Sequence, residues 1–350
     1  MDGEFLRSIL SGVPLPIVLV GQDERIHRLN PLAVKLFGSN MEGRHFLTVL
    51  RQPSIIDCLT DTLRRGVAHE TRYSRKDHSQ ETLYRVVCTP VGDATRAGVM
   101  ASFEDVTSIE TAGQMRRDFV ANVSHELRTP LTALIGFIDT LRGPARNDAA
   151  ARDRFLITME REAERMNRLV NDLLSLSQVE TEERIRPTDL QDVPALVDSV
   201  CHNLRPLSDD MQVALEVIPN VTLPKVLGDG DQLRQVFVNL IENAMKYGRD
   251  GGRVTIAFEV INRDPILAGP AVAIIVKDYG PGIDSIHIHR LTERFYRADD
   301  HRSQQLGGTG LGLAIVKHIL NRHRGRLKIE SKVGEGSCFA VLLPQPPQAG

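Results

Sequence analysis

Short apolar runs separated by turn-forming residues characterise the N-terminal third of the chain. Three runs have the length of β-strands: residues 17–20, 83–91 and 97–103. Asn30-Pro31 precedes residues 32–37, whose apolar spacing predicts a short helix ending at Gly38. The pattern predicts a small mixed α/β domain over residues 5–107, and alone it is compatible with any small α+β domain.

Helical periodicity then replaces the strand pattern. Apolar residues from Phe119 to Leu141 recur every three or four positions, which predicts an amphipathic helix over 118–142 that ends at Gly143-Pro144. A heptad seam follows: Leu156, Met159, Ala163, Met166, Val170 and Leu173. A hairpin of two such helices buries only part of its apolar stripes, and a four-helix bundle of two copies buries the rest. We therefore expect residues 108–183 to form a homodimer.

An α/β pattern begins after Pro187. Strands are expected at 213–217, 254–260, 271–276, 327–329 and 339–343, and helices at 194–205, 229–247 and 311–321. Residues 271–276 are apolar throughout, as in a central strand buried on both faces. These elements predict a C-terminal α/β sandwich over residues 187–345.

Length and charge narrow the class of protein. The 350 residues favour two or three domains, and a net charge of −2 provides no global basic surface for nucleic acid. The four cysteines have no metal-ligand spacing, and nothing argues for disulfides. No apolar run is long enough to span a bilayer and no signal peptide is evident, so we expect a cytoplasmic chain. Membrane association through partners or a removed N-terminal anchor stays open.

Candidate chemistry first appears on the helix at 118–142. His125 lies opposite the apolar stripe, so its imidazole should face solvent and can act as a nucleophile. Glu126 can accept a hydrogen bond from one ring nitrogen, and Thr129 follows one turn later. Pro130 should bend the helix. A lone exposed histidine is usually only a polar surface residue, but this one belongs to a Ser-His-Glu-Leu-Arg-Thr-Pro string.

Polar residues suited to a nucleotide occur downstream. Asn239, Asn243 and Lys246 share one helix stripe, where amide oxygens suit Mg²⁺ and the ammonium suits phosphate. The alternative is that these side chains only form a solvent-exposed polar face of the helix. Asp278–Gly282 follows the apolar strand directly, and the Asp278 carboxylate can accept a hydrogen bond from an adenine amine. An ordinary turn at the end of a strand is the alternative. Gly307–Leu313 opens a helix whose backbone N–H groups can bind phosphates.

Taken in order, these strings resemble the motifs of sensor histidine kinases of two-component signalling. The similar segments are Phe119–Leu131 (H-box), Asn239–Tyr247 (N-box), Asp278–Gly282 (G1 box), Phe295–Arg297 (F-box) and Gly308–Gly312 (G2 box). Residues 5–107 resemble a PAS sensor domain, with Asp105-Val106-Thr107 similar to the motif that couples PAS domains to an output helix. With Leu50–Pro53, the N-terminal half looks most like phosphate-regulon sensor kinases.

The resemblance implies a multidomain α+β protein: a PAS-like sensor domain, a dimeric phosphotransfer hairpin and a Bergerat-type ATP-binding domain. His125 would take the γ-phosphoryl of ATP·Mg²⁺ and pass it to an Asp in the receiver domain of a response regulator. Glu126 would act as base or orienter, and Thr129 would serve a regulator phosphatase activity. Residues 298–308 would form a lid anchored by Phe295. The implied nucleotide-site residues are Asn239, Asn243 (also the metal ligand), Lys246, Tyr247, Asp278, Gly280, Gly282, Phe295, Arg297, Gly308, Thr309, Gly310, Leu311 and Gly312.

Two other classes of protein compete with this interpretation. Chaperone and topoisomerase ATPases share the nucleotide fold, but they have a water-activating Glu where this chain has Asn239, which cannot act as a base. Glu242 is adjacent to Asn243 and should point about 100° away from it. A scaffold that only dimerises and binds a regulator is the other alternative. His27 and His45 are isolated and do not indicate a haem site.

Overall fold

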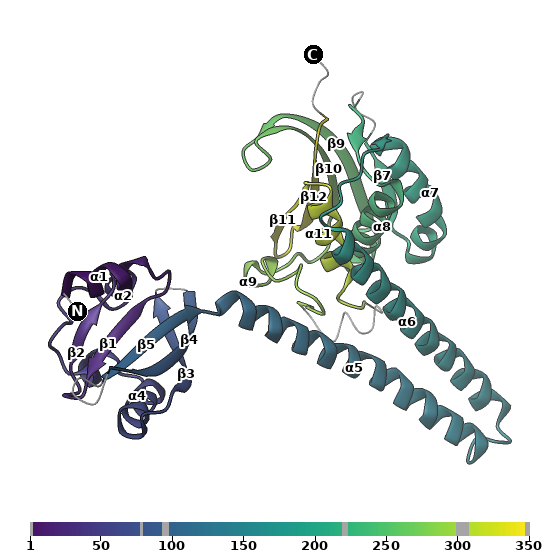
Figure 1. Cartoon of the computed structure of the whole chain (residues 1–350). Coiled ribbons are helices and arrows are strands. Elements are labelled where there is room, and N and C mark those ends of the chain that lie inside the picture. The colour runs from purple at the N-terminus through teal and green to yellow at the C-terminus, as the bar shows by residue number, and fades with distance from the viewer. Residues whose placement is uncertain (1–2, 78–79, 93–97, 219–222, 299–307, 347–350) are drawn as a thin grey trace. The chain divides into compact units, whose positions relative to one another are not determined.

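The computed structural model describes residues 3–77, 80–92, 98–218, 223–298 and 308–346 (Figure 1). The chain divides into two compact units, residues 1–120 and 121–350. Among the described residues, no helix combines the length and apolarity that crossing a bilayer requires.

A five-stranded antiparallel sheet forms the N-terminal unit, with strand order β2-β1-β5-β4-β3. Its strands are β1 (Ile17–Gly21), β2 (Ile26–Leu29), β3 (His69–Asp77), β4 (Gln80–Val91) and β5 (Gly98–Asp105). The three predicted strands are confirmed within the described residues, whereas β2 and β3 were missed. Both missed strands lie at the edges of the sheet, where polar side chains interrupt the apolar alternation.

Short helices complete this unit: α1 (Gly3–Gly12), α2 (Pro31–Phe37), α3 (Phe46–Val49) and α4 (Pro53–Arg65). The predicted helix α2 is confirmed. It begins after the buried Asn30, whose side chain caps it by accepting a hydrogen bond from the Ala33 amide. Helix α4 was missed, although Ile55, Leu59 and Thr62 form a buried stripe on it. It packs on β3 and β4 and closes the core.

The long helix α5 (Thr107–Arg142) begins eleven residues before the predicted start at 118. Thr107 fixes this start, since its hydroxyl donates to Asp105 and accepts from the backbone amide of Leu83 on β4. No proline lies between Thr107 and residue 118, and Gly113 alone does not end the helix, so the helix continues without interruption. Pro130 lies inside it and is buried.

Helix α6 (Ala149–Glu182) follows, with Asp148 as its N-cap, and α5 and α6 form the predicted hairpin (Figure 1). Most of the heptad seam stays exposed or half-buried in the single chain. A second stripe, Leu169, Leu176 and Val179, is buried, and α6 packs against α11. The heptad pattern of the sequence did not predict this second stripe.

The C-terminal sandwich contains a five-stranded sheet with order β11-β12-β10-β9-β7. Its strands are β7 (Ala214–Val217), β9 (Arg253–Asp264), β10 (Gly269–Asp278), β11 (Arg326–Lys332) and β12 (Gly336–Pro344). Helices α7 (Val193–Met211), α8 (Gly230–Tyr247) and α11 (Gly312–Arg322) pack against it. Smaller elements are β6 (Leu190–Gln191), β8 (Val226–Leu227), the 3₁₀ turn η1 (Arg249–Gly251) and α9 (Ser285–Ile288). The central position predicted for β10 is confirmed, and so is the mixed α+β class.

Candidate active site

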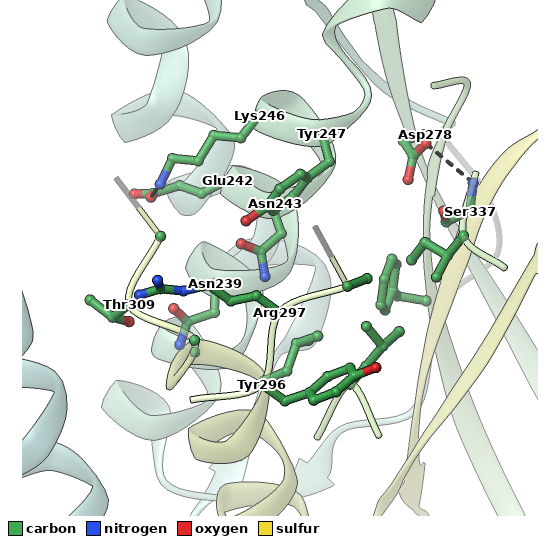
Figure 2. A pocket seen from close by; sticks show the side chains of 18 of the residues that line it. Asn239, Glu242, Asn243, Lys246, Tyr247, Asp278, Tyr296, Arg297, Thr309 and Ser337 are labelled. Atoms are coloured by element: carbon green, nitrogen blue, oxygen red, sulfur yellow. Dashed lines mark hydrogen bonds and ion pairs between the residues drawn. The ribbon is translucent and has the colours of Figure 1, made fainter. Parts of the chain in front are cut away.

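A cavity of about 640 Å³ opens between α8, the segment after β10, the start of α11 and the side of α6 (Figure 2). Eleven of the residues predicted for a nucleotide site line it: Asn239, Asn243, Lys246, Tyr247, Asp278, Gly282, Arg297, Gly308, Thr309, Gly310 and Gly312. Gly280, Phe295 and Leu311 lie outside the lining. The predicted lid falls mostly on residues 299–307, outside the described part of the chain.

Asp278 and Ser337 form one end of the cavity (Figure 2). One carboxylate oxygen of Asp278, which is 4% exposed, accepts from the backbone amides of Gly280 at 3.0 Å and Ser337 at 3.2 Å. Burial raises the pKa of Asp278, and these donors oppose the rise. The second carboxylate oxygen can therefore accept a hydrogen bond from a ligand amine in the cavity.

Ser337 was not found from the sequence. Strands β10 and β12 pair with Lys277 opposite Cys338, which places Ser337 beside Asp278. The Ser337 hydroxyl lies 2.9 Å from the hydroxyl of Ser331, which also accepts from the Ile283 amide. The contact between Ser337 and Asp278 could have been predicted only by pairing the start of β12 with the end of β10. The register of two strands cannot be determined from one sequence.

Helix α8 supplies the middle of the cavity wall through Asn239, Asn243 and Lys246, as its period predicted. Glu242 also lines the cavity, contrary to the expectation that it points away, and it pairs with Lys246 at 2.6 Å. Lys246 is therefore not free for phosphate in this arrangement. The amide oxygen of Asn243 and the carboxylate of Glu242 are hard oxygen donors.

This donor set fits Mg²⁺ bound together with phosphates. No group of three or more His, Cys, Asp or Glu side chains that could hold a metal occurs in the described residues. Mg²⁺ in phosphate sites usually takes one or two protein ligands, with phosphate oxygens and water completing its octahedron. Asn243 supplies one such ligand, whereas the carboxylate of Glu242 is already paired with Lys246.

The glycine loop before α11 has a backbone that only glycine adopts easily. Gly310 has φ +72°, and a Cβ there would meet the Phe295 backbone at 2.9 Å. The Phe295 amide donates to the Gly310 carbonyl at 2.9 Å, so Phe295 supports the loop through its main chain. Leu311 is fully buried at the helix start. The first turn of α11 thus presents its amides beside the cavity.

His125 is exposed on α5, as the helical wheel predicted. The Thr129 hydroxyl donates to the His125 carbonyl at 3.2 Å. The Glu126 carboxylate accepts from Arg165 and from Arg297, both at 3.0 Å, in place of the expected bond to the imidazole. Arg297 therefore joins the cavity to the histidine-bearing segment.

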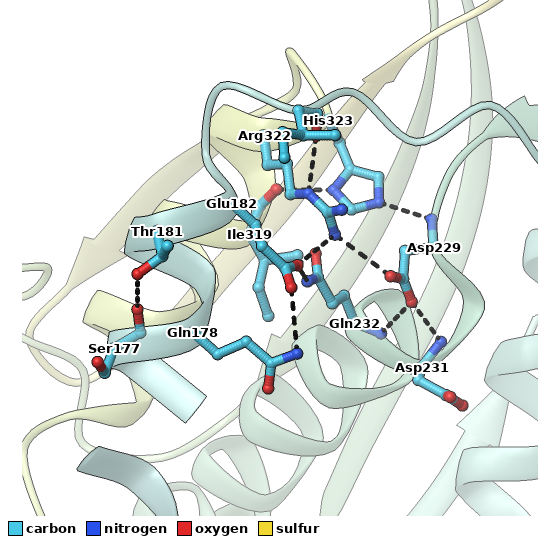
Figure 3. A network of polar contacts seen from close by, with 11 residues as sticks. Ser177, Gln178, Thr181, Glu182, Asp229, Asp231, Gln232, Ile319, Arg322 and His323 are labelled. Carbon is cyan, nitrogen blue, oxygen red and sulfur yellow. Dashed lines mark hydrogen bonds and ion pairs between the residues drawn. The ribbon is translucent and has the colours of Figure 1, made fainter. Parts of the chain in front are cut away.

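A polar network around the buried residues Arg322 and His323 fixes the end of α6 to the sandwich (Figure 3). Arg322 pairs with Glu182 of α6 at 3.3 Å and with Asp229, the N-cap of α8, at 3.2 Å. The Asp229 amide donates to His323 at 2.9 Å, and the other ring nitrogen of His323 is 2.7 Å from the Ile319 carbonyl. Burial lowers the pKa of His323, which matches a neutral ring with one donor and one acceptor.

Known proteins match both parts of the second unit. Residues 115–182 match the His Kinase A (phospho-acceptor) domain, and residues 228–347 match the histidine kinase-, DNA gyrase B- and HSP90-like ATPases. The phosphate regulon sensor protein PhoR of Pseudomonas aeruginosa is 43% identical over 237 residues, which are 67% of this chain and 51% of PhoR. A sensor protein kinase WalK of Staphylococcus aureus is 33% identical over 97% of this chain and 80% of that sequence.

A crystal structure of the histidine kinase ThkA with the response regulator TrrA has the same fold, with a TM-score of 0.52 at 20% identity. It covers 98% of this chain and 99% of that one. The chain spans about half the length of PhoR and of most WalK relatives it matches. The phospho-acceptor hairpin, the ATPase-type sandwich and the WalK match define the class: the chain belongs to the sensor histidine kinases.

Proposed function

We propose that the chain transfers the γ-phosphoryl group of ATP to His125 and then to an Asp of a response-regulator receiver domain. The observation that carries this proposal is that a buried arginine lining the cavity, Arg297, contacts Glu126, the residue next to an exposed histidine. Asp278 would accept a hydrogen bond from the adenine amine at one end. Thr309 and the amides before α11 would hold the phosphates on the opposite side (Figure 2).

In the phosphoryl transfer, a ring nitrogen of His125 forms a bond to the γ-phosphorus while the bond to the bridging oxygen breaks and ADP leaves. Glu126 would hold or accept the proton of the imidazole. Arg297 would stabilise the negative charge on the transferred group. Asn243 would hold Mg²⁺, which when bound neutralises phosphate charge.

The remaining assignments concern domains, partners and input. We assign residues 5–107 to a PAS-like sensor domain, 108–183 to a dimerising hairpin and 187–345 to the ATP-binding domain. Exposed apolar residues of the hairpin support a four-helix dimer: Leu131, Ile135, Ile138, Leu156, Val170 and Leu174. The likeness to PhoR supports phosphate-responsive signalling, and ThkA's complex supports a response-regulator partner. We assign these domains to the cytoplasm, because the proposed reaction uses ATP.

Replacing Asp278 by Asn should weaken nucleotide binding by about 10- to 100-fold, because a hydrogen bond to a charged acceptor contributes about 1.5–3 kcal/mol. The Asn oxygen can keep both backbone amides, but its NH₂ group would face the adenine amine as a second donor. Isothermal titration with an ATP analogue that resists hydrolysis measures the change. Asp250→Asn, in the 3₁₀ turn outside the cavity lining, is the matched control.

The same substitution should not lower stability at neutral pH. The pKa of Asp278 is raised in the folded state, so folding favours the protonated carboxyl. Its contribution to the free energy of unfolding is therefore complete below the unfolded-state pKa and is lost as pH rises through the folded-state pKa. At pH 7 the wild type bears the cost of a buried charge that Asn avoids. A variant that melts well below the wild type at pH 7 would contradict this account of Asp278.

Replacing Thr129 by Ala should remove regulator dephosphorylation and leave autophosphorylation of His125 within a few-fold of wild type. Thr129 would position water against the phospho-Asp of the regulator, a role for which its hydroxyl is required. Release of phosphate from a phosphorylated receiver domain measures the change, with Thr158→Ala, at a half-buried position on α6, as control. Intact dephosphorylation in the Thr129 variant would refute the phosphatase assignment.

A further inference from the structure

Helix α6 contributes part of the cavity wall, through Arg168, Asn171 and Asp172. The Asp172 carboxylate accepts a hydrogen bond from the Thr309 hydroxyl at 2.7 Å. Thr309 belongs to the glycine loop whose amides are expected to hold phosphates. A carboxylate of the histidine-bearing hairpin therefore accepts the hydrogen bond that the Thr309 hydroxyl would otherwise donate to a nucleotide phosphate.

A second hairpin carboxylate makes an equivalent contact. Glu126 pairs with Arg297, whose side chain is only 5% exposed. Within the described residues, the Nε atom of Arg297 is buried and has no hydrogen-bond partner. The Arg297 guanidinium thus has one donor without a partner among the described residues, while a terminal nitrogen is held by Glu126.

The charge of these carboxylates opposes the binding of a triphosphate. Burial raises the pKa of Asp172, which shows that its charged form is poorly solvated, while the Thr309 hydrogen bond and the Lys246 charge oppose this rise. Glu242 adds a further carboxylate to the same wall and Arg168 a positive charge. Phosphate oxygens near Thr309 would meet the Asp172 carboxylate at short range, where like charges in a poorly solvated site repel strongly.

We infer that Asp172 sets the nucleotide affinity of this chain: its carboxylate competes with the ATP phosphates for Thr309, so that nucleotide entry and the docking of α6 on the glycine loop oppose each other. This inference rests on the proposed function. Nucleotide that takes Arg297 also removes one of the two arginines that hold Glu126, and leaves its carboxylate paired with Arg165 alone.

The test is equilibrium binding of a hydrolysis-resistant ATP analogue with Mg²⁺ to the full chain. Asp172→Asn removes the charge and Asp172→Ala removes both the charge and the hydrogen-bond acceptor. Both should bind about three- to tenfold more tightly than wild type. Asp153→Asn is the matched control, because Asp153 lies on the same helix with its side chain 73% exposed. Its affinity should equal that of wild type.

The outcomes separate this inference from the proposed function. If wild type binds the analogue and both Asp172 variants bind it with the same or lower affinity than wild type, the inference is wrong and the proposed function still stands. Wild type that binds no analogue overturns the proposed function and the inference with it. Thermal melting of each variant without nucleotide shows whether it folds, and the two Asp172 variants give two independent readings of the same competition.

Discussion

Replacing Arg297 by Gln is expected to slow autophosphorylation by on the order of 10²–10³-fold, the usual effect of removing one donor that stabilises charge in a transition state. The guanidinium is buried in the cavity wall with one nitrogen unpartnered among the described residues. A neutral amide cannot replace its charge. The initial rate of label incorporation from saturating γ-labelled ATP measures the effect.

Arg294→Gln is the matched control for this substitution. Arg294 lies three residues earlier, pairs with Glu180 and does not line the cavity. Half-exposed ion pairs contribute at most about 1 kcal/mol, so the control should stay within a few-fold of wild type. Because Glu126 stays paired with Arg165 when Arg297 is replaced, a rate for Arg297→Gln close to wild type would show that Arg297 does not stabilise the transferred phosphoryl group.

Periodicity was sufficient to predict the elements that carry the site. The stripe of Asn239, Asn243 and Lys246 lies on the cavity because a 3.6-residue repeat decides which face of α8 they share. The unbroken apolar run of β10 predicted a central strand, and Asp278 follows from it as the polar end of that strand. Local patterns of this kind do not depend on distant residues.

Contacts between distant segments were not predictable in the same way. Ser337 reaches Asp278 only through the register of β12 on β10, and Arg297 reaches Glu126 across 171 positions of sequence. Glu242 was expected to point away, but the cavity is wide enough to include its position on α8. These features depend on how elements pack, which one sequence does not determine.

The competing ATPase function also depends on residues of the cavity wall. Asn239 lines the cavity where the related ATPases carry their base, and an amide cannot accept a proton from water. Glu242, the carboxylate closest in sequence to Asn243, is held by Lys246 at 2.6 Å. Both observations favour transfer to a protein nucleophile over sustained hydrolysis.

Replacing His125 by Gln should have the largest effect of all, a complete loss of label, because glutamine keeps polarity but has no nucleophilic nitrogen. His202→Gln is the matched control, since His202 is also exposed on a helix, α7. It should incorporate label like wild type.

The most direct test of the account is therefore to incubate wild type, His125→Gln and His202→Gln with γ-labelled ATP·Mg²⁺ and to challenge the labelled band with acid and alkali. The account predicts label on wild type and His202→Gln that is lost in acid, survives alkali and is absent from His125→Gln. Label that survives acid, or that persists on the His125 variant, would contradict the assignment of His125 as the phosphoryl acceptor.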